Sequence, residues 1–172
     1  MTTYVALVRA VNVGGTGTLS MPALLEMCRT CGFTAPTTYA VSGNAIFESD
    51  TDESDVKSQL EALMATHAGK TVPVFVRSAQ EIAAVVNANP FPDAEPSKVI
   101  VFFLDREPEP LTGSTATGAT TEMVVAGTRE IYVHYPDGIG RSKLKLPSAT
   151  AGTGRSINTV TKLAGLALGR KR

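Results

Sequence analysis

The sequence has few cysteines and no long apolar segment. Its 172 residues include two cysteines, Cys28 and Cys31, and no tryptophan. Two cysteines cannot build the disulfide framework that stabilises small secreted domains, so a reducing cytoplasm is expected. The longest uninterrupted apolar run is residues 99–104, which is too short for a membrane span or a signal peptide. The sequence therefore predicts a cytoplasmic protein with no membrane partner.

Acidic residues are absent from the last 35 residues of the chain. The final acid is Asp137, so the part of the chain up to it has a formal charge of minus eight and residues 138–172 have plus eight. Such a separation produces a positive field that attracts phosphates or nucleic acid. Alternatively, these bases pair with the acids of the first half and hold the chain together. The eight bases are Arg141, Lys143, Lys145, Arg155, Lys162, Arg170, Lys171 and Arg172, of which the last three are expected to form a solvated tail.

The first 77 residues have the hydrophobic periodicity of an alternating α and β structure. Strands are predicted at residues 4–9, 37–41, 45–49 and 72–77, with a tight hairpin turn at Gly43-Asn44. A helix capped by Ser20 follows the first strand, and a second helix carries apolar residues from Val56 to Met64 and His67 on one side. The order β-α-β-β-α-β is that of a ferredoxin-like plait.

The second half repeats this theme less regularly. Ser78 and Glu81 have the spacing of a capping box that opens a helix, and residues 98–104 predict a buried strand. Residues 122–126 and 130–134 predict a hairpin, and a final helix begins at Ser156 or Asn158. The predicted fold is α+β, with two packed ferredoxin-like (α-β plait) subdomains: residues 1–77, and residues 78–172 with a C-terminal helix and the basic segment.

The predicted strand order brings a glycine-rich loop close to the hairpin turn of the first subdomain. In a plait the first and third strands are neighbours, so the end of the first strand shares a sheet edge with the start of the third. Free backbone amides at a glycine loop that leads into a helix can bind an anion, whereas the same glycines can simply permit a tight crossover. The candidate ligand-binding residues at this edge are Arg9, Asn12, Gly14, Gly15, Ser42 and Asn44.

The basic C-terminal segment supplies the second group of candidate ligand-binding residues. Residues 137–144 predict a glycine turn into a short helix, and residues 156–162 predict the start of another. Two helix starts surrounded by bases could bind a phosphate or a carboxylate. The candidates here are Arg141, Ser142, Lys143, Arg155, Asn158, Thr159 and Lys162.

Residues that would indicate enzyme chemistry are sparse. Cys28 and Cys31 form a C-x-x-C near the end of a helix, where the dipole disfavours a thiolate and no further Cys or His pair completes a zinc site. His67 and His134 are expected to be packed or exposed rather than catalytic, and the acids near Asp52 suit a helix start. We therefore assign no catalytic residue, no metal and no cofactor.

Five segments together resemble a known family. They are residues 8–15 (VRAVNVGG), 41–47 (VSGNAIF), 88–91 (ANPF), 135–144 (YPDGIGRSKL) and 155–163 (RSINTVTKL). They are similar to the bacterial family catalogued as domain of unknown function 1697. The resemblance implies a cytoplasmic α+β protein of two packed plait-like subdomains without an established activity. Thr16 and Thr18 stand where members often carry lysine, which weakens the phosphate interpretation of the glycine loop.

Three classes of function follow from these observations. The favoured one is binding of an anionic, phosphorylated ligand (a nucleotide, a phosphometabolite or nucleic acid) by the basic C-terminal segment. The second is a small-molecule enzyme with a site in the cleft between the subdomains, and the third is a structural or interaction protein. The chain is expected to act as a monomer.

Overall fold

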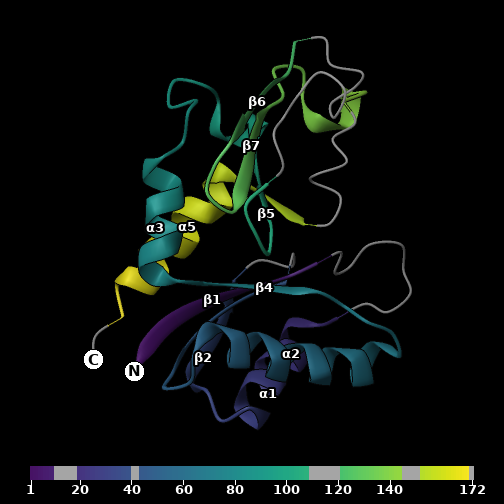
Figure 1. Ribbon diagram of the computed structural model, residues 1–172, viewed down its shortest axis with the longest axis vertical. Helices are drawn as coiled ribbons and strands as arrows, with labels where there is room; N and C mark the ends of the chain where they lie inside the picture. Colours follow the sequence, from purple (N-terminus) through teal and green to yellow (C-terminus); the bar gives the residue numbers. More distant parts are fainter. Residues whose placement is uncertain (10–18, 40–42, 109–120, 145–151, 171–172) are drawn as a thin grey trace. The chain divides into compact units, whose positions relative to one another are not determined.

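The computed structural model describes residues 1–9, 19–39, 43–108, 121–144 and 152–170 (Figure 1). By its internal contacts the chain divides into two units. Unit 1 comprises Met1–Ile82 and Leu163–Arg172, and unit 2 comprises Ala83–Lys162. Helices α3 (Ala79–Asn87) and α5 (Ile157–Leu168) contribute residues to both. A boundary between residues 77 and 78 remains a sequence-based prediction.

Unit 1 contains an antiparallel four-stranded sheet with the order β2-β3-β1-β4. Along the chain its elements alternate as the sequence predicts, β-α-β-β-α-β. They are β1 (Thr2–Val8), α1 (Met21–Thr30), β2 (Thr34–Tyr39), β3 (Asn44–Ser49), α2 (Glu53–Ala68) and β4 (Val74–Ser78). One face of the sheet packs against α1 and α2 around Leu24, Phe47 and Leu60.

Local capping interactions fix where the helices begin. The Ser20 side chain accepts a hydrogen bond from the Ala23 amide, and Asp52 does the same for Asp55. Ser78 and Glu81 form the predicted reciprocal capping box, with distances of 2.9 and 3.2 Å. Each bond satisfies an amide that has no partner within the first helical turn.

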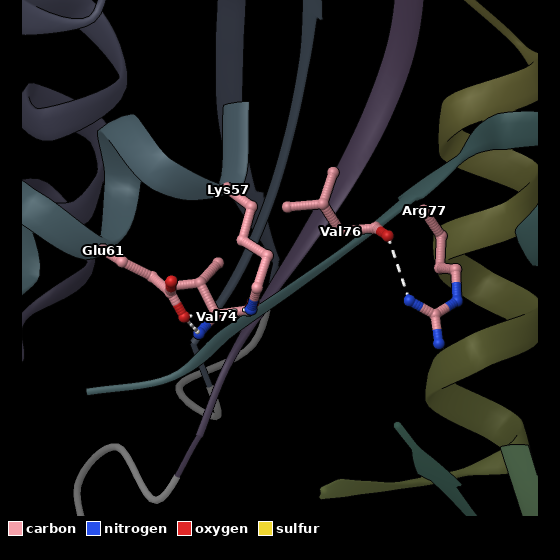
Figure 2. A network of polar contacts seen from close by, with 5 residues as sticks. All are labelled: Lys57, Glu61, Val74, Val76 and Arg77. Carbon is pink, nitrogen blue, oxygen red and sulfur yellow. Dashed lines mark hydrogen bonds and ion pairs between the residues drawn. The ribbon is translucent and has the colours of Figure 1, made fainter. Parts of the chain in front are cut away.

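The outer edge of β4 is occupied by a pair of side chains from α2. The Glu61 carboxylate accepts hydrogen bonds from Lys57 Nζ at 2.9 Å and from the Val74 amide at 3.0 Å, and Lys57 Nζ also donates to the Val74 carbonyl (Figure 2). In the same strand, buried Arg77 donates from Nη1 to the Val76 carbonyl (Figure 2). The ion pair thus satisfies a donor and an acceptor at the edge of the sheet.

Unit 2 contains a second antiparallel sheet with the order β6-β7-β5-β8. Its strands are β5 (Val99–Phe103), β6 (Met123–Ala126), β7 (Glu130–His134) and β8 (Thr153–Ser156). Two short 3-10 helices, η1 (Pro96–Lys98) and η2 (Ile139–Arg141), precede β5 and follow β7. A core cluster on one face contains Leu104, Ile131, Val133 and Tyr135. Among the described residues, two antiparallel sheets and four α-helices confirm the predicted α+β class.

One strand of unit 2 is absent from the sequence-based prediction. Residues 153–156 form β8, which pairs with β5 from Ile100↔Ser156 to Phe103↔Thr153. The segment reads Thr-Gly-Arg-Ser, which lacks the alternation of apolar and polar residues that indicates a strand. The final helix begins directly after it, and the Ser156 Oγ accepts a hydrogen bond from the Thr159 amide.

Candidate anion-binding site

Several chain segments of unit 2 reach the same edge of its sheet, where β7 and β8 end and β5 begins. The end of β7 at His134 lies opposite the start of β5 at Val99, and Ile100 lies opposite Ser156 at the end of β8. The segment after β7 is tied to this edge by a 2.8 Å hydrogen bond from the Tyr135 amide to the Lys98 carbonyl. Because only β5 separates β7 from β8, their ends are about 10 Å apart. Residues 138–144 and the first turn of α5 therefore leave the same sheet edge.

Three of the predicted bases on these segments are exposed. They are Arg141 at the end of η2, Lys143 two residues later, and Lys162 in the second turn of α5. Within the part of the chain that the structure describes, none of the three forms an ion pair with an acid. The first turn of α5 also carries no acidic residue. Exposed cations beside a helix N-terminus favour the binding of an anion.

Arg155 does not share this exposure. It lies within β8, two residues before the first residue of α5, and is only 7% exposed. Its Nη1 donates to Thr153 Oγ1 at 2.6 Å and to the Gly154 carbonyl at 2.9 Å. Burial lowers the pKa of the guanidinium to about 10, so it is still a cation at neutral pH. Arg155 does precede a helix start, as predicted, but the sequence does not reveal β8, in which its side chain is buried.

Two of the three predicted polar residues at this edge form hydrogen bonds with nearby groups. Ser142 Oγ donates to Glu122 Oε1 at 2.8 Å and accepts from the Leu144 amide at 3.1 Å, which fixes the chain after η2. Thr159 is half-buried against Ser156, whereas Asn158 is exposed. Asn158 thus joins the three exposed bases as an available donor, while Ser142 and Thr159 hold local structure.

The candidates of unit 1 lie at the other predicted edge. The Val8 amide donates to the Gly43 carbonyl at 2.9 Å, so the end of β1 does meet the turn before β3, as predicted. Asn44 is fully buried and its Nδ2 donates to the Tyr39 carbonyl at 2.9 Å, whereas Arg9 is half-buried. The remaining candidates, Asn12, Gly14, Gly15 and Ser42, lie outside the described residues.

The sequence-level charge separation does not persist between the two units. Unit 1 regains the basic end of the chain and has eight acids and eight bases, and unit 2 also has eight of each. Neither unit has the net positive charge that is typical of a nucleic-acid-binding domain. An attraction for anions therefore requires a local group of bases, such as Arg141, Lys143 and Lys162.

The structure places the cysteines where thiol chemistry is disfavoured. Cys28 is fully buried in α1, and burial raises the pKa of its thiol from 9.0 to about 12. Burial also raises the pKa of the half-buried Cys31. Among the described residues, no three Cys, His, Asp or Glu side chains group as metal ligands. The C-x-x-C sequence is part of the packing of α1.

A thiol-reactivity experiment tests this placement. In a Cys31→Ser variant the remaining Cys28 should react with an aromatic disulfide reagent at pH 8 at least about a hundredfold more slowly than the unfolded chain, because little thiolate forms at that pH. A Cys28→Ser variant, which keeps the half-buried thiol, should react faster than Cys31→Ser. Equal rates in the two folded variants would contradict the assignment.

Two residues form hydrogen bonds that the sequence did not predict. Glu122 reaches the chain after η2 through Ser142, and no motif relates these two positions. Arg170, expected in a solvated tail, donates from Nη1 to the Ala35 carbonyl at 2.7 Å and from Nη2 to Thr37 Oγ1 and the Ile46 carbonyl. The expectation of a free basic tail is therefore wrong at its first residue.

A family model and a solved structure are similar to this chain. The model of a family described as a protein of unknown function (DUF1697) matches residues 1–132. A solved structure, that of the conserved bacterial protein SP0830 from Streptococcus pneumoniae, is similar with a TM-score of 0.75 and 20% sequence identity, and the match covers 96% of this chain and 98% of that one. Among curated proteins, none matches this sequence. Over the described residues, no helix has the length and apolar character needed to cross a membrane.

Proposed function

Because the chain belongs to the DUF1697 family of proteins of unknown function, its activity has to be argued from its residues, and we propose that unit 2 binds a small phosphorylated ligand at the sheet edge where β7 and β8 end. The observation that carries the proposal is the group of three exposed bases, Arg141, Lys143 and Lys162, on segments that leave this edge. A phosphate there would also face the first-turn amides of α5, together with Asn158.

The balance of charges favours a small ligand over a nucleic acid. Two acids also lie near this edge, and both accept hydrogen bonds from hydroxyl groups: Glu122 from Ser142 and Asp137 from Thr121. A long polyanion would run past these carboxylates, whereas a ligand with one or two phosphates needs only the three bases and the helix start. The ligand class is therefore a nucleotide or a phosphometabolite.

A thermal-shift titration tests the proposal. Inorganic phosphate, pyrophosphate, ATP and a single-stranded oligonucleotide should be added to the protein at low ionic strength, because a ligand that binds only the folded state raises Tm. ATP or pyrophosphate is expected to raise Tm, and Lys143→Gln/Lys162→Gln should weaken that binding by tenfold or more, a loss of about 1.4 kcal/mol.

The control variant is Lys70→Gln, which removes the charge of an exposed lysine in unit 1. Its affinity for the same ligands should equal that of the wild type. If no phosphorylated probe raises Tm, the proposal is wrong; if the oligonucleotide binds more tightly than ATP with a steep salt dependence, the ligand is a nucleic acid instead.

A further inference from the structure

The sheets of the two units follow one plan. Counted along the chain, the four strands of each sheet lie in the order second, third, first and fourth, which is β2-β3-β1-β4 in unit 1 and β6-β7-β5-β8 in unit 2. The fourth strand pairs antiparallel with the first in the same register, since Arg77 lies opposite Val5 and Arg155 lies opposite Val101. In both units the fourth strand leads directly into a helix, α3 or α5. Arg77 and Arg155 therefore occupy equivalent positions of the two sheets.

The junction between this strand and the helix has the same structure in both units. Each arginine is buried, and its Nη1 donates to the carbonyl of the preceding residue, at 3.0 Å for Arg77 and 2.9 Å for Arg155. The next residue is a serine, Ser78 or Ser156, whose Oγ accepts a hydrogen bond from the amide three residues later, at 3.2 and 3.3 Å. The residues four and seven positions after the serine are buried in both helices: Ile82 and Val85 in α3, Val160 and Leu163 in α5. Agreement at each of these levels indicates that unit 2 repeats unit 1.

The two helix starts differ in charge. The third residue of α3 is Glu81, whose carboxylate accepts a hydrogen bond from the Ser78 amide at 2.9 Å. This helix thus holds its own anion at its N-terminus, where the helix dipole favours a negative charge. The third residue of α5 is Thr159, and the sequence of its first turn contains no acid. The sixth residue is Ala84 in α3 but Lys162 in α5, so the second copy has lost the carboxylate and gained a cation.

We propose that a phosphate group of the ligand lies at the start of α5 in the place that the Glu81 carboxylate takes at the start of α3. The phosphate then accepts a hydrogen bond from the Ser156 amide, which is the counterpart of the Ser78 amide. Lys162 supports it, because the Cα–Cβ bonds of a helix tilt toward its N-terminus and direct long side chains that way. This position rests on the proposed function and adds the backbone group that binds the ligand.

An exchange of the two differing residues tests whether the helix starts are equivalent. Thr159→Glu should build the capping box of α3 at the start of α5 and raise Tm by about 2 °C, and Glu81→Thr should lower Tm by at least as much. The control is Thr161→Glu, which adds the same charge at an exposed position of α5 beyond reach of the Ser156 amide and should raise Tm by less than about 1 °C. If Thr159→Glu is no more stable than Thr161→Glu, the two starts are not equivalent and the inference is wrong.

Pyrophosphate binding to the same variants, measured by calorimetry, tests the position of the phosphate. In Thr159→Glu the introduced carboxylate takes the proposed phosphate position, so the affinity should fall tenfold or more. Thr161→Glu should weaken binding by less than about threefold, because its exposed charge is screened by salt. If Thr159→Glu binds pyrophosphate as the wild type does, the inferred position is overturned and the proposed function stands. If the wild type binds no phosphorylated probe, the proposed function is wrong and the position falls with it.

Discussion

Gly152→Ala should lower the free energy of unfolding by about 3 kcal/mol, the largest single effect that we expect. A Cβ at this position would lie 2.2 Å from the carbonyl oxygen of Phe103, 2.7 Å from Leu104 Cδ2 and 3.1 Å from the Phe103 carbonyl carbon. Two of these atoms belong to the backbone at the end of β5 and cannot rotate away. The methyl group would therefore separate β8 from β5 where their pairing begins, at Phe103↔Thr153.

Gly165→Ala provides the matched control, because it makes the same chemical change in an open position. Apart from its chain neighbours and the nearby backbone of its own helix, no atom lies within 4 Å of the point that a methyl group would occupy at Gly165, which is inside α5. Alanine favours a helix over glycine, so this variant should gain about 0.5 to 1 kcal/mol. Urea unfolding followed by far-UV circular dichroism measures both changes, since the chain has no tryptophan to report on unfolding. If Gly152→Ala is as stable as the wild type, β8 does not approach β5 as closely as the structure shows.

The elements that could be predicted from the sequence are those with a local physical signal. Ser20, the Ser78 and Glu81 pair and Ser156 mark helix starts because a side chain bonds to an amide three residues away. The sheet order of unit 1 follows from its element order, because few arrangements connect β-α-β-β-α-β with short crossovers.

The elements that could not be predicted depend on contacts between distant parts of the chain. β8 becomes a strand only through its pairing with β5, some fifty residues earlier in the sequence. Arg155 does stand near the start of α5, but without β8 the sequence gives no sign that its side chain is buried. Because Leu163–Arg172 belongs to unit 1, the bases at the end of the chain balance the acids of that unit. The charge separation along the sequence is therefore not a separation between the two units. The sequence also left open whether the bases of the candidate site face solvent or pair with acids, and the structure shows Arg141, Lys143 and Lys162 exposed.

Arg170→Ala should have the second largest effect, a loss of about 2 kcal/mol, because its guanidinium closes an irregular part of the β2 edge. The pairing of β2 with β3 shifts register between Thr34 and Thr37, and within this bulge Ala35 adopts a φ of 48°, which is strained for a residue with a side chain. Arg170 donates to the Ala35 carbonyl and across the strands to that of Ile46. Burial lowers the pKa of this guanidinium, and Glu48 opposes that shift.

Two further variants separate the geometry of this contact from its charge. Arg170→Lys keeps the cation but replaces a planar fork with a single nitrogen, which cannot reach two carbonyls and Thr37 Oγ1 together, so about half of the loss should remain. Arg29→Ala removes an exposed arginine whose 3.4 Å ion pair with Glu26 spans one helical turn, and it should cost less than about 0.5 kcal/mol. Urea unfolding again gives the three values. If Arg170→Ala costs no more than Arg29→Ala, the end of the chain does not stabilise the bulge of β2, and the strain at Ala35 is balanced by the pairing of β2 with β3 alone.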